Sequence, residues 1–339
     1  IYSYNMDKIN PVKLSKNEIV SELGFSKVDI NIKGPNINYI VINSIKRMIQ
    51  SKIPIFIFNS FDITVNTSVF NNNYIKGHVQ NIPIWGIENM IDEYIPIEEN
   101  EEDEEDDQNE DISEPIVIIN EDSELNTNKK IDITLNKLTM YIDFKNKTNE
   151  IIVVTTDNAK FYYKEGLIKS PYKNAIQIVK LQPGQEIKMS AKAELGEEQV
   201  SALYSAVSAC FFKQKNDNDY DFIVESRGQL TEKRIIEVGL KAINKMLQNF
   251  LEILPKNQGL EGKIVIDDED HTLGNIISYG MQNHPAVKFC GYNTPHPLKK
   301  QIIIHYKLEN GNLNTIMKDV VVYYETIFDN LRESFSKLL

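Results

Sequence analysis

The stretch DDEDHTLGNIISYGMQNHPAVKFCGYNTPHPL, residues 267–298, decides the fold. Its charged start, apolar middle and proline stop are typical of a helix that connects two strands. Thr272 is the expected N-cap because its hydroxyl can accept a hydrogen bond from a free backbone amide. Asp267 to Asp270 add negative charge where a helix N-terminus favours it, and Pro285 is the expected end. The apolar face comprises Leu273, Ile276, Ile277 and Met281.

Two glycines interrupt this helix. Gly274 and Gly280 each cost about 1 kcal/mol of helix stability relative to alanine. Their presence is explained if another backbone or a bulky side chain packs closely against them. The stretch contains no nucleophile beside a base and no set of metal ligands. We therefore expect a packing surface here.

The same stretch carries a family resemblance. The run DDEDHTLGN, followed by NHPAVKFCGY and PHPL, is very similar to the small α-like subunit of multisubunit RNA polymerases. In the eukaryotic nuclear enzyme that is the eleventh subunit, and the archaeal enzyme has a counterpart. The resemblance implies a non-catalytic subunit that pairs with a second, larger α-like subunit.

A second resemblance lies near the N-terminus, in residues 28–56, VDINIKGPNINYIVINSIKRMIQSKIPIF. The alternation of apolar residues predicts a strand, and Gly34-Pro35 is expected to open a helix over residues 36–50 that Pro54 ends. The stretch resembles the start of the large α-like subunit, which is the third subunit of the nuclear enzyme, its archaeal counterpart, or bacterial α.

In that family an Asn-x-Leu-Arg-Arg motif on this helix faces the second-largest polymerase subunit. The matching residues here are Asn43, Ile45, Lys46 and Arg47. Lys46 replaces the first arginine, so the positive charge is kept but the bidentate guanidinium fork is lost.

The middle of the chain reads mainly as strands. We expect several short strands in residues 55–95, a hairpin around a turn at 146–149, and a strand, a Pro183-Gly184 turn and another strand over 176–196. Parts of these runs resemble the insert domain of the large α-like subunit. His78 is expected to be hydrogen-bonded or exposed rather than a metal ligand.

The remaining residues complete two modules. A hairpin is expected over 206–228, followed by a helix from Thr231 to Leu254. A strand is expected at 301–308, and a final amphipathic helix over about 313–339 keeps a period of about 3.6 residues along its whole length.

The fold class is therefore α+β. We expect two α-like dimerisation modules packed as an intrachain pseudo-heterodimer, with a mostly β insert domain in the first module. The expected boundaries are 1–54 and 206–255 for the third-subunit-like module, 55–205 for the insert, 98–111 for a disordered acidic loop, 256–262 for a linker, and 263–339 for the eleventh-subunit-like module.

Charge is concentrated in one place. The net charge is −12, and residues 98–111 alone hold eleven carboxylates, so the rest of the chain is nearly neutral. A nearly neutral body argues against a general nucleic-acid-binding surface. The acidic run is expected to be disordered, because its charges repel each other and cannot be buried. Capture of Ca²⁺, binding of a basic partner and mimicry of nucleic acid remain open for it.

The chain offers little for a cofactor or a metal. The family's insert sometimes carries a cysteine-rich zinc or iron–sulfur site, but no cysteine precedes Cys210, so that site does not transfer. Cys210 and Cys290 are expected to be buried free thiols. We expect no cofactor, no metal and, without a run of 18 apolar residues, no membrane span.

The resemblance implies an assembly platform of a DNA-directed RNA polymerase. The expected partners are the largest and second-largest subunits and other small polymerase subunits, without sequence-specific DNA contact. Lys46 and Arg47 would face the second-largest subunit, and the face around His271, Thr272, Gly274 and Asn275 would face the largest. The fusion of both modules resembles polymerases of large cytoplasmic DNA viruses, which implies the host cytoplasm and the virion.

Two alternatives compete with this function. One is an enzyme that uses the carboxylates and the imidazole of Asp267 to His271. Consecutive residues point in different directions, however, which favours a charged helix entry. The other is a free-standing adaptor that binds basic partners through the acidic loop.

Overall fold

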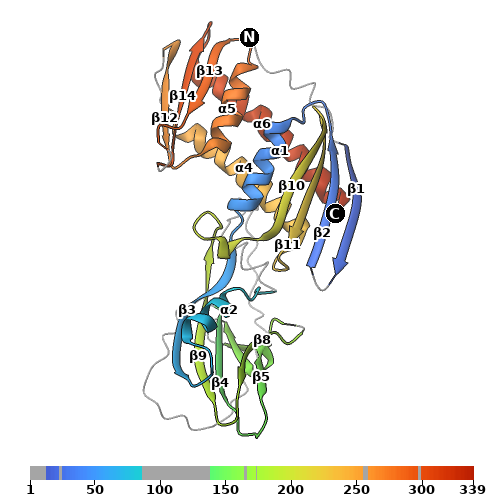
Figure 1. The fold of residues 1–339 in the computed structure, drawn as a ribbon. Helices are drawn as coiled ribbons and strands as arrows, with labels where there is room; N and C mark the ends of the chain where they lie inside the picture. Colours follow the sequence, from blue (N-terminus) through green and yellow to red (C-terminus); the bar gives the residue numbers. More distant parts are fainter. Residues whose placement is uncertain are drawn as a thin grey trace, which may run out of the picture.

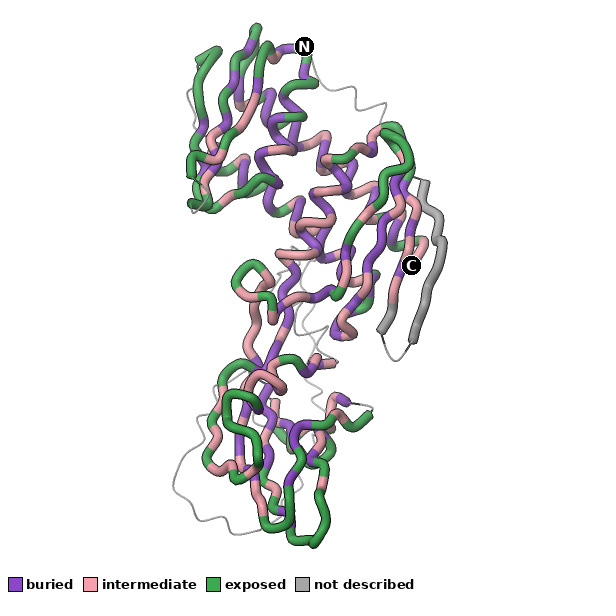
Figure 2. The backbone as a smooth tube through the Cα atoms, viewed as in Figure 1, coloured by how far each residue is buried: buried purple, intermediate pink, exposed green. Residues whose placement is uncertain are grey.

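A computed structural model describes residues 13–22, 25–85, 138–163, 166–172, 174–254, 259–296 and 299–339. The acidic run 98–111, residues 256–258 of the expected linker and the end of the opening stretch at 297–298 lie outside these residues. Figure 1 shows an upper body, in which helices lie between two sheets, and a lower lobe connected to it through β3 (Ile55–Asn66) and β9 (Glu186–Gly196). In Figure 2 buried residues follow the helices of the upper body closely and recur along the strands of both parts.

The first sheet of the upper body has the strand order β1-β2-β11-β10. It joins the N-terminal part of the chain to residues nearly 200 positions later, since Val28 pairs with Val224. The hairpin expected over 206–228 is confirmed, because β10 and β11 pair antiparallel. Its strands are β1 (Lys13–Glu22), β2 (Phe25–Lys33), β10 (Val207–Asn216) and β11 (Asp219–Ser226).

The second sheet has the order β12-β14-β13 and is antiparallel throughout. Its strands are β12 (Glu261–Asp267), β13 (Val287–Asn293) and β14 (Gln301–Leu308). Four helices lie between the two sheets in Figure 1. They are α1 (Tyr39–Ser51), α4 (Glu232–Glu252), α5 (His271–Gln282) and α6 (Leu313–Leu338).

One topology occurs twice. A strand, a short helix, two strands and a long helix follow each other as β2, α1, β10, β11, α4 and again as β12, α5, β13, β14, α6. In both sheets the first strand pairs with the last strand of its set, giving β2-β11-β10 and β12-β14-β13. The first set differs in that residues 52–206 separate its short helix from its last two strands.

The two long helices run antiparallel along each other. Three polar contacts join α4 to α6: Lys233 to the carbonyl of Ser336, Asn244 to Asp329 at 2.9 Å, and Gln248 to Glu325. The apolar stripe predicted for α6 is confirmed. Its buried members are Ile316, Val320, Val321, Tyr324, Ile327, Phe328, Leu331 and Phe335.

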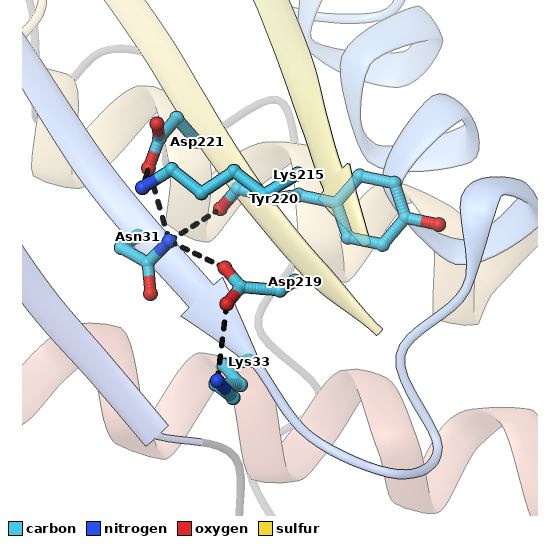
Figure 3. Close-up of polar contacts among 6 residues, drawn as sticks. All are labelled: Asn31, Lys33, Lys215, Asp219, Tyr220 and Asp221. Carbon is cyan, nitrogen blue, oxygen red and sulfur yellow. Dashed lines mark hydrogen bonds and ion pairs between the residues drawn. The ribbon is translucent and has the colours of Figure 1, made fainter. Parts of the chain in front are cut away.

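A polar network joins the end of β2 to the start of β11 (Figure 3). The side-chain amide of Asn31 donates to Asp219 at 2.8 Å and to Asp221 at 2.9 Å. Lys33 pairs with Asp219 and Lys215 pairs with Asp221. Hydrogen bonds from Asn31 and Lys33 lower the pKa of Asp219. Asp219 and Asp221 are therefore each paired with a lysine of the same sheet.

The lower lobe differs from the expectation for residues 55–95. A single long strand, β3 (Ile55–Asn66), and a helix, α2 (Asn72–Gln80), occupy the described part. Three consecutive asparagines, Asn71 to Asn73, stand at the start of this helix, and the side chain of Asn71 accepts a hydrogen bond from the amide of Tyr74 at 2.8 Å. His78 is hydrogen-bonded as expected, with Nε2 at 2.8 Å from the carbonyl oxygen of Gln177.

The hairpin expected around residues 146–149 is wrong. β4 pairs with β6 and β9, whereas β5 pairs with β8 in a separate sheet. Asn146 explains the change of sheet: its buried amide donates to the carbonyls of Glu150 and Leu181, which ties the turn to the end of β8. The remaining strands are β4 (Thr139–Lys145), β5 (Ile152–Thr155), β6 (Ala159–Tyr163), β7 (Gly166–Ile168), β8 (Gln177–Leu181) and β9 (Glu186–Gly196).

Two helix starts also need correction. α1 begins after Asn38, whose side chain caps Val41, and Pro35 lies in the preceding turn, where its carbonyl accepts from Asn218. α5 begins after Asp270, which caps Thr272 at 2.7 Å, so Thr272 is not the N-cap. A charged carboxylate is as good a cap as a hydroxyl, and it stands two residues earlier. The Thr231 cap of α4 is confirmed.

Candidate functional site: the junction of two short helices

The expected site residues fall into two groups. Ile45, Thr272 and Gly274 are buried, so they support the packing and do not lie on an outer surface. His271 is exposed, and four others are partly exposed. These four are Asn43, Lys46, Arg47 and Asn275.

The two short helices meet where α1 ends and α5 begins. The guanidinium Nε of Arg47 donates to Oγ1 of Thr272 at 2.8 Å, and its NH2 group donates to Asp270 at 2.6 Å. The partners lie more than 220 positions apart in the chain. The family resemblance implies that Arg47 faces the second-largest subunit; in the structure its guanidinium is engaged within the chain. Lys46, one position earlier, makes no such bond to any described residue.

The four carboxylates before α5 have different roles. Asp267 accepts a hydrogen bond from Gln301 at 2.6 Å, and Asp270 caps the helix. Asp268 has a left-handed backbone with φ of 61°, and its amide donates to the carbonyl of Lys300 at 2.7 Å. Glu269 faces a cleft. The group does not converge on one point, and the described residues contain no cluster of three or more His, Cys, Asp or Glu that could hold a metal ion.

A cleft of about 540 Å³ lies beside this junction. Six parts of the chain line it: the end of α1, residues 198–205, the start of β10, one residue of α4, the loop before α5 with its first turn, and Lys300. We call the buried apolar residues of its lining the floor; they are Met48, Val207, Cys210 and Met246. Thr272 is a buried polar residue of the same lining.

The electrostatics of neighbouring carboxylates differ. Burial raises the pKa of Glu269 to about 7, and the nearby charge of Asp270 adds to the effect. For Asp270, burial acts in the same direction, but hydrogen bonds from Thr272 and the charge of Arg47 outweigh it, so the pKa is lowered. Asp270 therefore stays ionised, and Glu269 is close to its titration point at neutral pH.

The glycines of α5 have neighbours within their own half of the chain. A Cβ on Gly274 would lie 2.5 Å from the ring of Tyr292 on β13, and a Cβ on Gly280 would collide with Val320 on α6. The prediction of a bulky close neighbour is confirmed. Because these neighbours belong to β13 and α6, the glycines serve packing within the second half of the chain. His271 completes this end, with Nδ1 at 3.1 Å from the hydroxyl of Tyr292.

Sequence reasoning missed the exposed aromatic residues beside the expected site. Tyr39 on α1 is 53% exposed and contacts Phe212, and Tyr279 lies on the exposed face of α5 with His271 and Asn275. The signal was available, because positions 271, 275 and 279 recur at helical spacing opposite the apolar face. Exposed aromatic residues near partly buried polar ones are typical of protein interfaces.

The site is suited to contacts and not to covalent chemistry. Burial raises the pKa of the Cys210 thiol to about 12 and that of Cys290 to about 11, so neither is a reactive thiolate. Both are free and buried, as predicted. Among the described helices, none is long and apolar enough to cross a membrane.

Comparison with known proteins finds subunits of RNA polymerases among the relatives of this chain. The RNA polymerase Rpb3/Rpb11 dimerisation domain family matches residues 261–334. The putative DNA directed RNA polymerase subunit R470 of Acanthamoeba polyphaga mimivirus is 26% identical over 330 residues, which cover 91% of this chain and 90% of that protein.

Shorter relatives match as well. Subunit Rpo11 of the DNA-directed RNA polymerase of Metallosphaera sedula is 31% identical over 97 residues, which are 27% of this chain and 96% of that subunit. The probable subunit RPAC2 of DNA-directed RNA polymerases I and III of Caenorhabditis elegans is 33% identical over 75 residues. The chain spans about half the length of that relative, 52%. The chain belongs to the family of α-like DNA-directed RNA polymerase subunits of the Rpb3/Rpb11 type.

Proposed function

We propose that this chain is the assembly platform of a DNA-dependent RNA polymerase and holds its two large catalytic subunits together. One observation carries the proposal: a single topology occurs twice, and the two copies join through their helices. Relatives across the family are polymerase subunits. The chain itself is a non-catalytic subunit, and catalysis belongs to the large subunits.

The finer proposal is an intrachain pseudo-heterodimer. The third-subunit-like module comprises residues 1–54 and 206–255, and the eleventh-subunit-like module comprises 263–339, with 55–205 as the insert. The repeated strand order and the antiparallel pairing of α4 with α6 support it. Covalent linkage raises the effective concentration of one module near the other, so that assembly needs no bimolecular step.

Cutting the chain between Gln258 and Glu261 tests the pseudo-heterodimer. Two fragments that copurify are expected, because the apolar stripes of α4 and α6 are both deeply buried. Phe328→Ala on α6, in the cut form, should weaken copurification, since removing a buried phenylalanine costs about 3–5 kcal/mol. Two independently soluble monomers would contradict the proposal.

The proposed partners are the largest and second-largest subunits, with other small subunits and without sequence-specific DNA contact. The outer face of α1 around Asn43 and Lys46 receives the second-largest subunit, and the face of His271 and Asn275 receives the largest. The mimivirus relative supports a viral transcription site, with the host cytoplasm and the virion as its compartments. No observation favours the adaptor function, whose acidic run lies outside the described residues.

Charge reversal tests the docking face. Lys46→Glu is expected to abolish copurification with the two large subunits, while the thermal unfolding of the isolated chain is unchanged. Lys245→Glu, at an exposed position of α4, is the matched control and should leave assembly intact. Arg47 is left unaltered because it is engaged with Asp270 and Thr272. Assembly retained by Lys46→Glu would remove α1 from the interface.

A further inference from the structure

The cleft beside the helix junction combines an apolar floor with a carboxylate wall. Met48, Cys210 and Met246 are each less than a tenth exposed and form part of its floor. Glu269 lines the wall. A surface of this kind suits a ligand group that has an apolar stem and a charged tip.

Glu269 lacks a cation of its own. Apart from the backbone amide of Asp270, it forms no hydrogen bond or ion pair with another described residue. A carboxylate that is largely withdrawn from water without a counter-ion is costly, and proteins resolve the cost by protonation or by pairing. In the isolated chain the raised pKa of Glu269 favours protonation. A cationic partner would instead allow the carboxylate to stay ionised and form an ion pair.

The backbone holds Glu269 in this position. Asp268, directly before it, adopts a left-handed conformation that is unfavourable for a residue with a side chain, and its amide is tied to the carbonyl of Lys300 at 2.7 Å. Asp270, directly after it, is fixed as the N-cap of α5. Residues kept in sparsely populated backbone regions require support from their surroundings and concentrate at binding sites.

Three cations line the cleft: Arg47 and Lys52 are engaged with other carboxylates, and Lys300 is exposed. Arg47 pairs with Asp270, and Lys52 pairs with Glu197 at 3.8 Å. Lys52 lowers the pKa of Glu269 only in part, because burial and the charge of Asp270 act against it. The complete set of charged lining residues is Arg47, Lys52, Glu198, Asp268, Glu269, Asp270 and Lys300.

We propose that this cleft receives an arginine or lysine side chain from a segment of a large polymerase subunit, with Glu269 as its counter-ion. The methylene stem would lie on the apolar floor while the charged group meets the carboxylate. The inference rests on the proposed platform function and adds the chemistry of one contact. Charge complementarity with a carboxylate that has no cation selects a basic segment over an acidic or purely apolar one.

Binding should depend on pH. A cation favours the ionised form of Glu269, so complex formation releases a proton where the free chain holds one. The affinity should therefore rise as the pH increases from about 6 to about 8, by at most about tenfold per pH unit, and level off above the pKa of about 7. Cys210 on the floor stays neutral over this range because its pKa is raised to about 12.

The experiment measures the Kd between the full chain and the co-expressed pair of large subunits from the same polymerase, at several pH values and fixed ionic strength. Glu269→Gln, which keeps size and removes charge, should weaken binding about tenfold at pH 8 and abolish the pH dependence. Glu269→Asp should retain the pH dependence with weaker affinity. Glu309→Gln is the matched control at an exposed carboxylate outside the cleft, and should match the wild type.

A second measurement locates the partner segment. A photo-crosslinking residue at Ser208, exposed on the cleft rim, should couple to a segment that contains arginine or lysine. Coupling to a segment without either residue would overturn the proposal. So would a Glu269→Gln chain that binds like the wild type at every pH while assembly proceeds. If the wild-type chain does not bind the large subunits at all, the platform function fails together with this inference.

Discussion

Arg47 donates a hydrogen bond of 2.8 Å to the hydroxyl of Thr272, and this contact joins the end of α1 to the start of α5. The same guanidinium reaches Asp270, the residue that caps α5. One side chain from the first half of the chain thus connects to both the cap and the first turn of a helix in the second half.

Replacing Arg47 should loosen this junction. Arg47→Ala is expected to lower the free energy of unfolding by about 1 kcal/mol, a value reduced from that of a buried charged pair because both side chains are more than a third exposed. Arg47→Lys should recover less than half of the loss, because an ammonium cannot bond both partners as a fork does. Urea unfolding measures both variants.

A double-mutant cycle isolates the interaction. Asp270→Asn keeps a good N-cap and removes the charge, so it is the matched partner for Arg47→Ala. The two single changes should be less than additive. Strict additivity would mean that the contact contributes nothing to stability.

Glu269 should make the free chain less stable at higher pH. Its folded pKa of about 7 lies above the usual glutamate value of about 4.3, so the folded state holds a proton that the unfolded state has lost. Stability from this group is therefore fully present below about pH 4.3 and is lost as the pH rises to about 7. Glu269→Gln should be more stable than the wild type at pH 8, by about 1–2 kcal/mol after allowance for partial exposure, and similar to it at pH 4.

Urea unfolding at both pH values checks this expectation. Glu309→Gln provides the control for loss of one negative charge at an exposed site. A wild-type chain and a Glu269→Gln chain with parallel pH profiles would show that Glu269 titrates normally.

The two glycines of α5 should resist substitution. Gly280→Ala places a methyl group against Val320, and Gly274→Ala places one against the ring of Tyr292. Each is expected to lower the free energy of unfolding by about 1–3 kcal/mol, because overpacking outweighs the gain in helix propensity. Thermal unfolding of the variants measures the loss.

Gly77 offers the matched control. It lies inside α2, and a Cβ there would meet nothing within 4 Å. Gly77→Ala should therefore raise stability by about 0.5–1 kcal/mol through helix propensity alone. Similar effects at Gly77 and Gly280 would show that α5 and α6 can move apart without cost.

The two thiols should be inert in the native chain. Burial raises the pKa of Cys210 to about 12 and that of Cys290 to about 11, which leaves almost no thiolate at pH 8. A thiol-reactive dye should label the chain only after denaturant is added. Rapid labelling of one thiol under native conditions would identify a segment that opens locally.

Strong periodicity made much of this fold predictable from the sequence. The stripe of α6 extends over 26 residues, so its buried face follows directly from spacing. The hairpin of β10 and β11 was equally clear, because a polar turn separates two apolar runs. Both features are set by residues close together in the sequence, and the tertiary contacts favour the same helix and the same hairpin.

Features set by distant partners were not predictable in the same way. Nothing near Asn146 indicates that its amide will bind Leu181, which separates β4 from β5. The asparagine cluster at 71–73 has turn chemistry as well as capping chemistry, and burial of Ile75 and Val79 decided for a helix.

In the candidate site, too, local features were predictable from the sequence and features set by distant partners were not. The spacing placed Lys46 and Arg47 together on α1, but only the position of α5 shows that Arg47 is bonded to Asp270 and Thr272. The role of Glu269 depends on a cleft lined by parts of the chain that are far apart in sequence. No local pattern distinguishes it from the three aspartates beside it.

The lower lobe leaves and re-enters the upper body at one place, because Ile55 and Gly196 are paired neighbours on β3 and β9. A loop that starts and ends at adjacent points can change in length without moving the rest of the molecule. The lobe can therefore gain, lose or exchange residues during evolution while the fold of the upper body stays the same. An engineer could likewise replace it with a short turn, or use it to carry a tag away from the helices.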